Sequence, residues 1–159
     1  MTDLTELMNY TYNLCEDGEY ENAIQYFDAI LKKDPKNIRI IIDKGVTLTH
    51  IDKFEEAIKC YDRSLNLDPQ NLDALINKGS ALHSLQKFEE AIKCYDLALK
   101  IDKNSVMALA YKGLSLGELD KLEESIQYFD RSLAIDNQYD IAINNKKTAL
   151  DLLKQKYQK

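Results

Sequence analysis

The sequence has no tryptophan, two prolines, three cysteines and five glycines among its 159 residues. So little proline and glycine, with a 30% charged fraction, argues against a disordered or fibrous chain and favours a helix-rich one. The cysteines are odd in number and form no CxxC pair, which argues against a disulfide framework. We therefore expect Cys15, Cys60 and Cys94 to be free thiols that serve packing.

Long apolar runs and basic blocks are also missing. No run approaches the roughly 18 residues that span a bilayer, and residues 1–11 carry acids where a signal peptide would carry Lys or Arg. We expect no membrane association and a cytoplasmic location. Acids outnumber Lys and Arg by 27 to 21, giving a net charge of −6. A phosphate backbone would be repelled on average, which disfavours nucleic acid as a partner.

Signatures of catalysis are absent as well. The sequence has no Gly-rich phosphate loop, no Ser/His/Asp set and no zinc-ligand spacing. His50 and His83 have no carboxylate arranged behind them in the sequence. We expect a chain that is not an enzyme and takes no cofactor and no metal.

What the sequence does contain is an internal repeat. The segment Lys53 to Asp62, KFEEAIKCYD, recurs letter for letter at Lys87 to Asp96, 34 residues later. Stepping by this period predicts four units at residues 4–37, 38–71, 72–105 and 106–139, followed by a half unit at 140–159. A fixed period of this length is typical of an array of small structural units.

Residues that share a position in successive units, which we call a column, keep one character. Small side chains, aromatic rings and aliphatic side chains each have their own columns; examples are Ala23, Ala57, Ala91 and Ser125, then Phe27, Tyr61, Tyr95 and Phe129, then Leu14, Leu48, Leu82 and Leu116. Within each unit the apolar columns recur at three and four residues, which is helix periodicity. Small columns indicate close helix crossings. Each unit is therefore predicted to be a helix, a short turn and a second helix.

Turns and helix starts also repeat. The column of Gly18, Asp52, Gln86 and Asp120 interrupts the helix pattern, and Asn37, Asn71 and Ser105 stand where a side-chain oxygen caps the next helix. At the last boundary Tyr139 takes the capping column, so we expect Asp140 to cap instead, with a small register slip. The predicted helices are 4–17, 19–33, 38–51, 53–67, 73–85, 87–101, 107–119, 121–135 and 141–156.

This set of columns resembles the tetratricopeptide repeat over residues 4–139. Two departures are the missing Trp and the lysines Lys44, Lys78 and Lys112 in a column where Leu is commoner; we expect each Lys stem to lie on apolar surface with its charge in water. The resemblance implies an all-α, right-handed superhelical solenoid of antiparallel hairpins, with the first helices forming a concave wall. It places in that groove Met8, Asn9, Tyr12, Ile42, Asp43, Val46, Ile76, Asn77, Ser80, Ala110, Tyr111 and Leu114, with Cys15, Thr49, His50, His83, Ser84 and Glu118 at its lip.

The groove composition suggests what it binds. Four apolar residues would gain nothing by facing water, so we expect them to contact a ligand: Ile42, Val46, Ile76 and Leu114. The alternative is that they pack on neighbouring first helices. Asn9, Asn77 and Asn145 share a column that suits contacts to a peptide backbone. No set of groove cations suits an acidic tail. The expected partner is a peptide or protein segment with apolar anchors and neutral or basic flanks.

Two other functions stay open. The chain could self-assemble through its end faces or its groove, or it could be an RNA-binding helical repeat, which the charge disfavours.

Residues 140–159 are expected to form a solvating helix. Its Ile141, Thr148, Ala149 and Leu152 would face the last hairpin, and Asn144, Lys147, Lys154 and Lys156 would face water.

Overall fold

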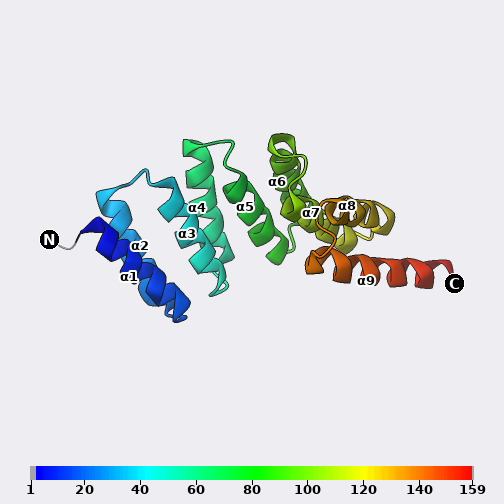
Figure 1. Cartoon of the computed structure of the whole chain (residues 1–159), viewed down its shortest axis with the longest axis horizontal. Coiled ribbons are helices and arrows are strands. Elements are labelled where there is room, and N and C mark those ends of the chain that lie inside the picture. The colour runs from blue at the N-terminus through cyan, green and yellow to red at the C-terminus, as the bar shows by residue number, and fades with distance from the viewer. Residues whose placement is uncertain (1–2, 159) are drawn as a thin grey trace. The chain divides into compact units, whose positions relative to one another are not determined.

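A computed structural model of the chain describes residues 3–158, and this range contains nine helices and no strand (Figure 1). The helices are α1 (Leu4–Glu16), α2 (Tyr20–Lys33), α3 (Ile38–Thr49), α4 (Phe54–Leu67), α5 (Leu72–Ser84), α6 (Phe88–Ile101), α7 (Val106–Glu118), α8 (Leu122–Ile135) and α9 (Asp140–Tyr157). Every boundary lies within two residues of its predicted place. The all-helical prediction is confirmed. We refer to α1, α3, α5, α7 and α9 as the first helices, and to α2, α4, α6 and α8 as the second helices.

The turn column has a demanding backbone geometry. Gly18, Asp52, Gln86 and Asp120 all have positive φ, at 78°, 57°, 59° and 58°. This left-handed conformation costs an L-residue roughly 1–2 kcal/mol, a cost that glycine escapes. Three of the four turns therefore use a side chain in a strained position.

The predicted helix caps are confirmed at three boundaries. The side chains of Asn37, Asn71 and Ser105 accept hydrogen bonds from the amides of Ile40, Ala74 and Ala108, at 3.2, 3.0 and 3.4 Å.

The expectation of a slip and an Asp140 cap at the fourth boundary is wrong. Helix α9 begins at Asp140, in register with the start of α7, and Tyr139 precedes it without a side-chain cap. The backbone of Tyr139 (φ −72°, ψ 97°) matches that of Asn37 (φ −70°, ψ 92°). Its carbonyl accepts from the amide of Ile143 at 3.1 Å, so the first turn of α9 forms without the missing cap.

The chain divides into two compact units, the first ending at Ala81 and the second beginning at Leu82. Each unit has an aromatic ring seated over a glycine. A Cβ atom at Gly45 would lie 2.6 Å from the ring of Tyr61, and one at Gly113 would lie 2.8 Å from the ring of Phe129. The column of Gly45 and Gly113, in which the sequence places small residues, therefore marks close helix crossings. In α1 this column holds the buried Thr11, whose hydroxyl donates to the Leu7 carbonyl at 2.7 Å.

The lysine column forms a series of ion pairs. Lys44 pairs with Asp28 at 2.6 Å, Lys78 with Asp62 at 2.6 Å and Lys146 with Asp130 at 2.5 Å, and Lys112 pairs with Asp96 in the same way. The expectation that these charges sit in water is wrong, because each lysine reaches back from a first helix to the second helix of the preceding hairpin. In α1 the same column holds Tyr10, whose ring meets that of Tyr26 edge to face at 5.0 Å.

Helix α9 packs through a narrower face than the sequence indicated. Ala142 and Ala149 are buried, and Ile141 and Leu153 pack against the core around Phe129. Thr148 and Leu152 face the α7–α8 hairpin across a cavity, but both are exposed; Leu152 is 46% exposed. The buried stripe runs through positions 142, 149 and 153, so residues 148 and 152 fall beside it, where they border a cavity. Asn144, Lys147, Lys154 and Lys156 are exposed, as expected.

Candidate binding surface

The first unit has a cavity of about 180 Å³ between its first hairpin and α3. Its lining comes from the inward columns of these helices: Tyr12, Cys15, Tyr20, Phe27, Asp43, Val46, Thr47 and His50. Phe27 is a buried floor shared with the core. His50 lies stacked on Tyr20, with ring centroids 4.8 Å apart and planes at 7°. A second hollow of about 440 Å³ lies beside it, lined by Ile38, Arg39, Ile42, Asp43, Asn71 and Asp73.

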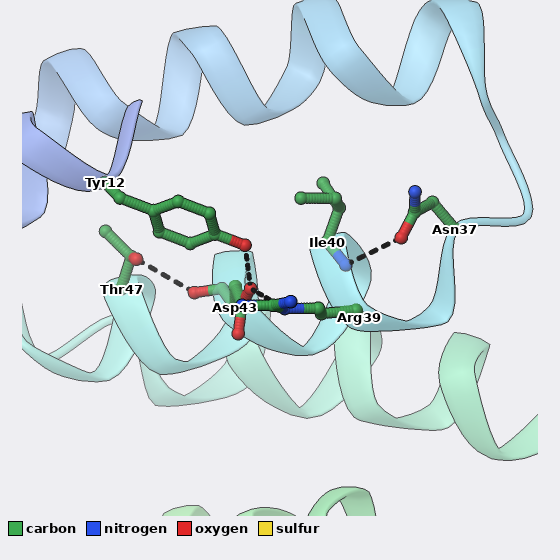
Figure 2. A network of polar contacts seen from close by, with 6 residues as sticks. All are labelled: Tyr12, Asn37, Arg39, Ile40, Asp43 and Thr47. Carbon is green, nitrogen blue, oxygen red and sulfur yellow. Dashed lines mark hydrogen bonds and ion pairs between the residues drawn. The ribbon is translucent and has the colours of Figure 1, made fainter. Parts of the chain in front are cut away.

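A polar network occupies one wall of the first-unit cavity (Figure 2). The Tyr12 hydroxyl donates to a carboxylate oxygen of Asp43 at 2.5 Å, and Nε of Arg39 lies 3.7 Å from the same oxygen. The Arg39 guanidinium also lies 5.6 Å from the centre of the Tyr12 ring. Burial, followed by this hydrogen bond to Asp43, raises the pKa of Tyr12 to about 12. The acid expected to attract a basic partner is thus already engaged within the chain.

The second unit has a cavity of about 210 Å³ between the hairpin of α7 and α8 and the closing helix α9. Its lining is Leu114, Gly117, Glu118, Asp120, Leu122, Ser125, Phe129, Asn145, Thr148, Ala149 and Leu152. A shallow continuation of about 360 Å³ reaches Gln155 and Lys156. The Lys156 ammonium bonds to Asp120 at 2.6 Å along this edge.

The two cavities lie in the same columns. Adding 102, which is three periods of 34, to each of the eight residue numbers that line the first-unit cavity gives eight of the residues that line the second. Phe27 corresponds to Phe129, and both are buried. The chemistry changes elsewhere: Leu114, Leu122 and Leu152 replace Tyr12, Tyr20 and His50, and Gly117 replaces Cys15. The structure thus builds one cavity twice, and leucines stand in the second where two tyrosines and a histidine stand in the first.

The structure separates the predicted groove residues into lining and core. Tyr12, Asp43 and Val46 line the first-unit cavity, and Leu114 lines the second. Ile42 borders the second hollow of the first unit but is only 9% exposed, and Ile76 is only 5% exposed. Ile42 packs with residues that include Ala74 of the next first helix. This is the alternative given above, in which these side chains pack on neighbouring first helices.

The other predicted residues line none of these cavities. Met8 packs against the first core, Asn9 is exposed, and Asn77 and Ser80 are half-buried. The ring of Tyr111 is tilted against that of Tyr95, with centroids 6.1 Å apart. Their place in a binding groove stays a prediction.

His83 occupies the column that holds Cys15 in the first-unit cavity and Gly117 in the second-unit cavity. Its Nδ1 lies 2.9 Å from the Ser115 hydroxyl, and its ring meets Phe88 edge to face at 5.1 Å. Burial lowers the pKa of His83, although the charge of Glu118 opposes this. His50, by contrast, rests on Tyr20 in the first unit. Within residues 3–158 no group of three or more His, Cys, Asp or Glu side chains is placed to hold a metal ion.

Sequence reasoning missed that α9 forms a wall of the second-unit cavity. It treated residues 140–159 as a solvating helix, yet Asn145, Thr148, Ala149 and Leu152 form one wall of the second-unit cavity. The 34-residue period carried the signal, because it places these four residues in the columns of Asp43, Val46, Thr47 and His50.

Two family models match the sequence. A model described as "Psidin, N-terminal TPR repeats region" matches residues 8–106, and one described as "Tetratricopeptide repeat" matches residues 108–139. The chain belongs to the tetratricopeptide repeat family. The nine helices of the described residues fit about four of these repeats and a closing helix. No curated protein matches the sequence.

Solved structures with similar folds are also tetratricopeptide repeat proteins. A crystal structure of MamA is 21% identical over 93% of this chain and 81% of its own, with a TM-score of 0.81. YrrB, described as a repeat protein with an unusual peptide-binding site, is 20% identical over 96% and 78%, with a TM-score of 0.73. The first repeat domain of Spaghetti (RPAP3), bound to the HSP90 peptide SRMEEVD, is 28% identical over 73% and 92%, with a TM-score of 0.70.

These matches define the broad class of this repeat chain. It is a protein-interaction module, of a family that is typically non-catalytic. None of the helices formed by residues 3–158 is long and apolar enough to cross a membrane.

Proposed function

We propose that the chain holds a peptide or protein segment on the surface formed by its first helices. The observation that carries this proposal is the recurrence of one cavity in the same columns of both units. Each cavity opens between consecutive first helices, where an extended segment could place side chains at intervals. Apolar cavities with a few polar groups at the rim are the usual form of a ligand site.

The charges of the surface favour a partner with apolar anchors and neutral or basic flanks. Arg39 is the cation among the residues that line the two hollows of the first unit, and it already pairs with Asp43. Asp73 and Glu118 are exposed acids at the cavity rims. The peptide SRMEEVD of the RPAP3 complex is acidic, so a partner of that kind would meet like charge here.

Asn145 is suited to bind a peptide backbone in the second unit. It lines the cavity, and its side-chain amide donates to the Ile141 carbonyl at 2.7 Å, which fixes the orientation of the group. An amide oxygen held in this way can accept from a partner's backbone N–H group. Such a contact would hold a segment without reading its sequence.

The test is a selection of random peptides from a display library against the full chain. We expect basic, leucine- or valine-containing peptides that bind in the micromolar range, about −8 kcal/mol. Val46→Ala and Leu114→Ala should each weaken binding about tenfold, because a buried apolar contact contributes roughly 1.5–3 kcal/mol. Helical circular dichroism confirms that these variants stay folded.

Lys59→Ala and Lys93→Ala serve as matched controls. These exposed lysines share one column of the second helices, so the substitutions should leave peptide affinity unchanged. Loss of binding in the lysine variants, with binding intact in Val46→Ala and Leu114→Ala, would place the partner on the other face. Recovery of no peptide above background would overturn the proposal.

One observation favours self-assembly as a second candidate function. Ile143 and Leu150 on α9 are 41% and 37% exposed, whereas Ile41 and Leu48 of the same columns in α3 are buried. A second copy could cover this face. Sedimentation velocity over a range of concentrations should then show a dimer that Leu150→Ser dissolves, and a monomer throughout would exclude it.

A further inference from the structure

The cavity of the second unit has a glycine in its lining, Gly117. Its column holds Cys15, Thr49 and His83 in the other repeats and Gly117 in α7. His83 shows what a large side chain reaches from this position, since its ring contacts Phe88 and its Nδ1 lies 2.9 Å from the Ser115 hydroxyl. A Cβ atom at Gly117 would lie 3.4 Å from Oγ of Ser125, which is ordinary contact. Neither packing nor a positive φ requires glycine at this position.

The floor of the open space is apolar, and polar side chains complete its walls. Leu122, Phe129 and Ala149 form a buried floor, and Leu152 stands half exposed at the mouth. At about 210 Å³ the cavity exceeds the roughly 150 Å³ that admits benzene in a buried apolar site. The hydroxyl of Ser125 in the lining is already used, because it donates to the Gly113 carbonyl at 2.7 Å. The cavity therefore suits a branched aliphatic side chain.

The rim of the cavity supplies charge. Glu118 follows Gly117, is exposed, and forms no ion pair with the residues that the structure describes. Asp120 is held by Lys156. A ligand that fills the cavity would thus meet one uncompensated carboxylate at its edge, and a cation next to the aliphatic group would complement it.

We propose that this cavity takes a leucine-sized side chain of a partner segment, and that Glu118 pairs with a lysine or arginine beside that side chain. The inference rests on the proposed function, to which it adds the partner's anchor and the place where the anchor binds. The aliphatic group displaces water from Leu122 and Leu152, and the cation sets which residues can stand beside the anchor.

The test uses the dipeptide N-acetyl-Leu-Lys-amide, titrated into the full chain while the leucine methyl signals are followed by NMR. We expect saturable shifts at Leu114, Leu122 and Leu152. N-acetyl-Ala-Lys-amide should bind about tenfold more weakly, because fewer apolar carbons are buried. N-acetyl-Leu-Glu-amide should also bind more weakly, and added salt should reduce that difference. Equal binding of all three dipeptides would overturn the proposal.

Substitutions at Gly117 make the test specific. Gly117→His copies the residue of the preceding repeat and should abolish the methyl shifts, and Gly117→Ala, which adds one carbon in available space, should weaken binding several-fold. Lys93→Ala, an exposed position outside both cavities, should leave dipeptide binding unchanged. Glu118→Gln should remove the preference for Lys over Glu.

Other outcomes assign the cavity differently. Methyl shifts that depend on protein concentration without dipeptide would mean that a second copy fills the cavity, which overturns this proposal. Library-selected peptides that bind equally to Gly117→His would also overturn it, while leaving the proposed function standing. If no library peptide binds, the proposed function fails, and the dipeptide titration still decides whether the cavity takes the anchor.

Discussion

The cavities of the two units show how a repeat separates folding from recognition. Both rest on a buried phenylalanine, Phe27 or Phe129, at positions three periods apart. Around this shared floor the first unit places a tyrosine bonded to Asp43 and a stacked histidine, and the second places leucines. Columns that face the core keep their size, because packing errors there are costly. Columns that face the cavity vary in polarity without disturbing the hairpins.

Among the changes that test this comparison, removing residues 140–159 should have the largest effect on stability. The deletion takes away the α9 wall and exposes Leu122, Phe129 and Ile126. The loss of Ala142, Ala149, Ile141 and Leu153 should cost roughly 3 kcal/mol of unfolding free energy. Urea denaturation should show this loss, and gel filtration should show self-association. A monodisperse monomer of unchanged stability would mean that α9 is not needed to cover the second unit.

Gly113→Ala should destabilise the chain by about 2 kcal/mol, since the added carbon would lie 2.8 Å from the Phe129 ring. The higher helix propensity of alanine offsets part of this cost. The matched variant is Thr11→Ala, because Thr11 occupies the same column over Phe27 and its Cβ is already accommodated. Urea denaturation of both variants should show the larger loss for Gly113→Ala. Equal losses would show that the two aromatic floors are equally tolerant.

Tyr12→Phe should cost about 1 kcal/mol at neutral pH, because it removes a hydrogen bond to a charged group that is partly exposed. Burial and the bond to Asp43 raise the pKa of Tyr12 from 10.0 to about 12, so its stabilising contribution is fully present below pH 10 and is lost as the pH rises through about 12. The difference in unfolding free energy between the wild type and Tyr12→Phe should therefore shrink over this range. Leu114→Ala, in the same column, should show no such pH dependence.

Gln86→Gly should give a small gain, about 0.5 kcal/mol, by relieving a left-handed side chain at φ 59°. Asp120→Gly relieves the same strain at φ 58° but also removes the ion pair with Lys156, so its net effect should be close to zero. Thermal unfolding of both variants measures the difference. If Asp120→Gly is as stabilising as Gln86→Gly, the pair at the edge of the second-unit cavity contributes nothing.

The sequence was enough to predict every helix, because the period placed each apolar column in register four times over. It also predicted Tyr12, Asp43, Val46 and Leu114 in surface columns, and these residues line the cavities. It could not separate Ile42, which packs against Ala74, from Val46, because both lie on the same side of one helix and differ only in what the neighbouring helix places opposite. Nor could it show that Gly117 lines a cavity, because an open space depends on several side chains at once.

The ion pairs between Asp28 and Lys44 and in the later repeats bear on how such a chain can change length. Each pair joins an aspartate in the second helix of one repeat to a lysine in the first helix of the next repeat, always 16 residues apart. At the start of the chain, this position of the first helix holds Tyr10 instead of a lysine. A duplicated repeat would bring one aspartate and one lysine, and each would find a partner in a neighbouring repeat. Duplication or loss of whole repeats would therefore leave no aspartate or lysine unpaired at the new boundary. The number of repeats can thus evolve separately from the residues that line the cavities.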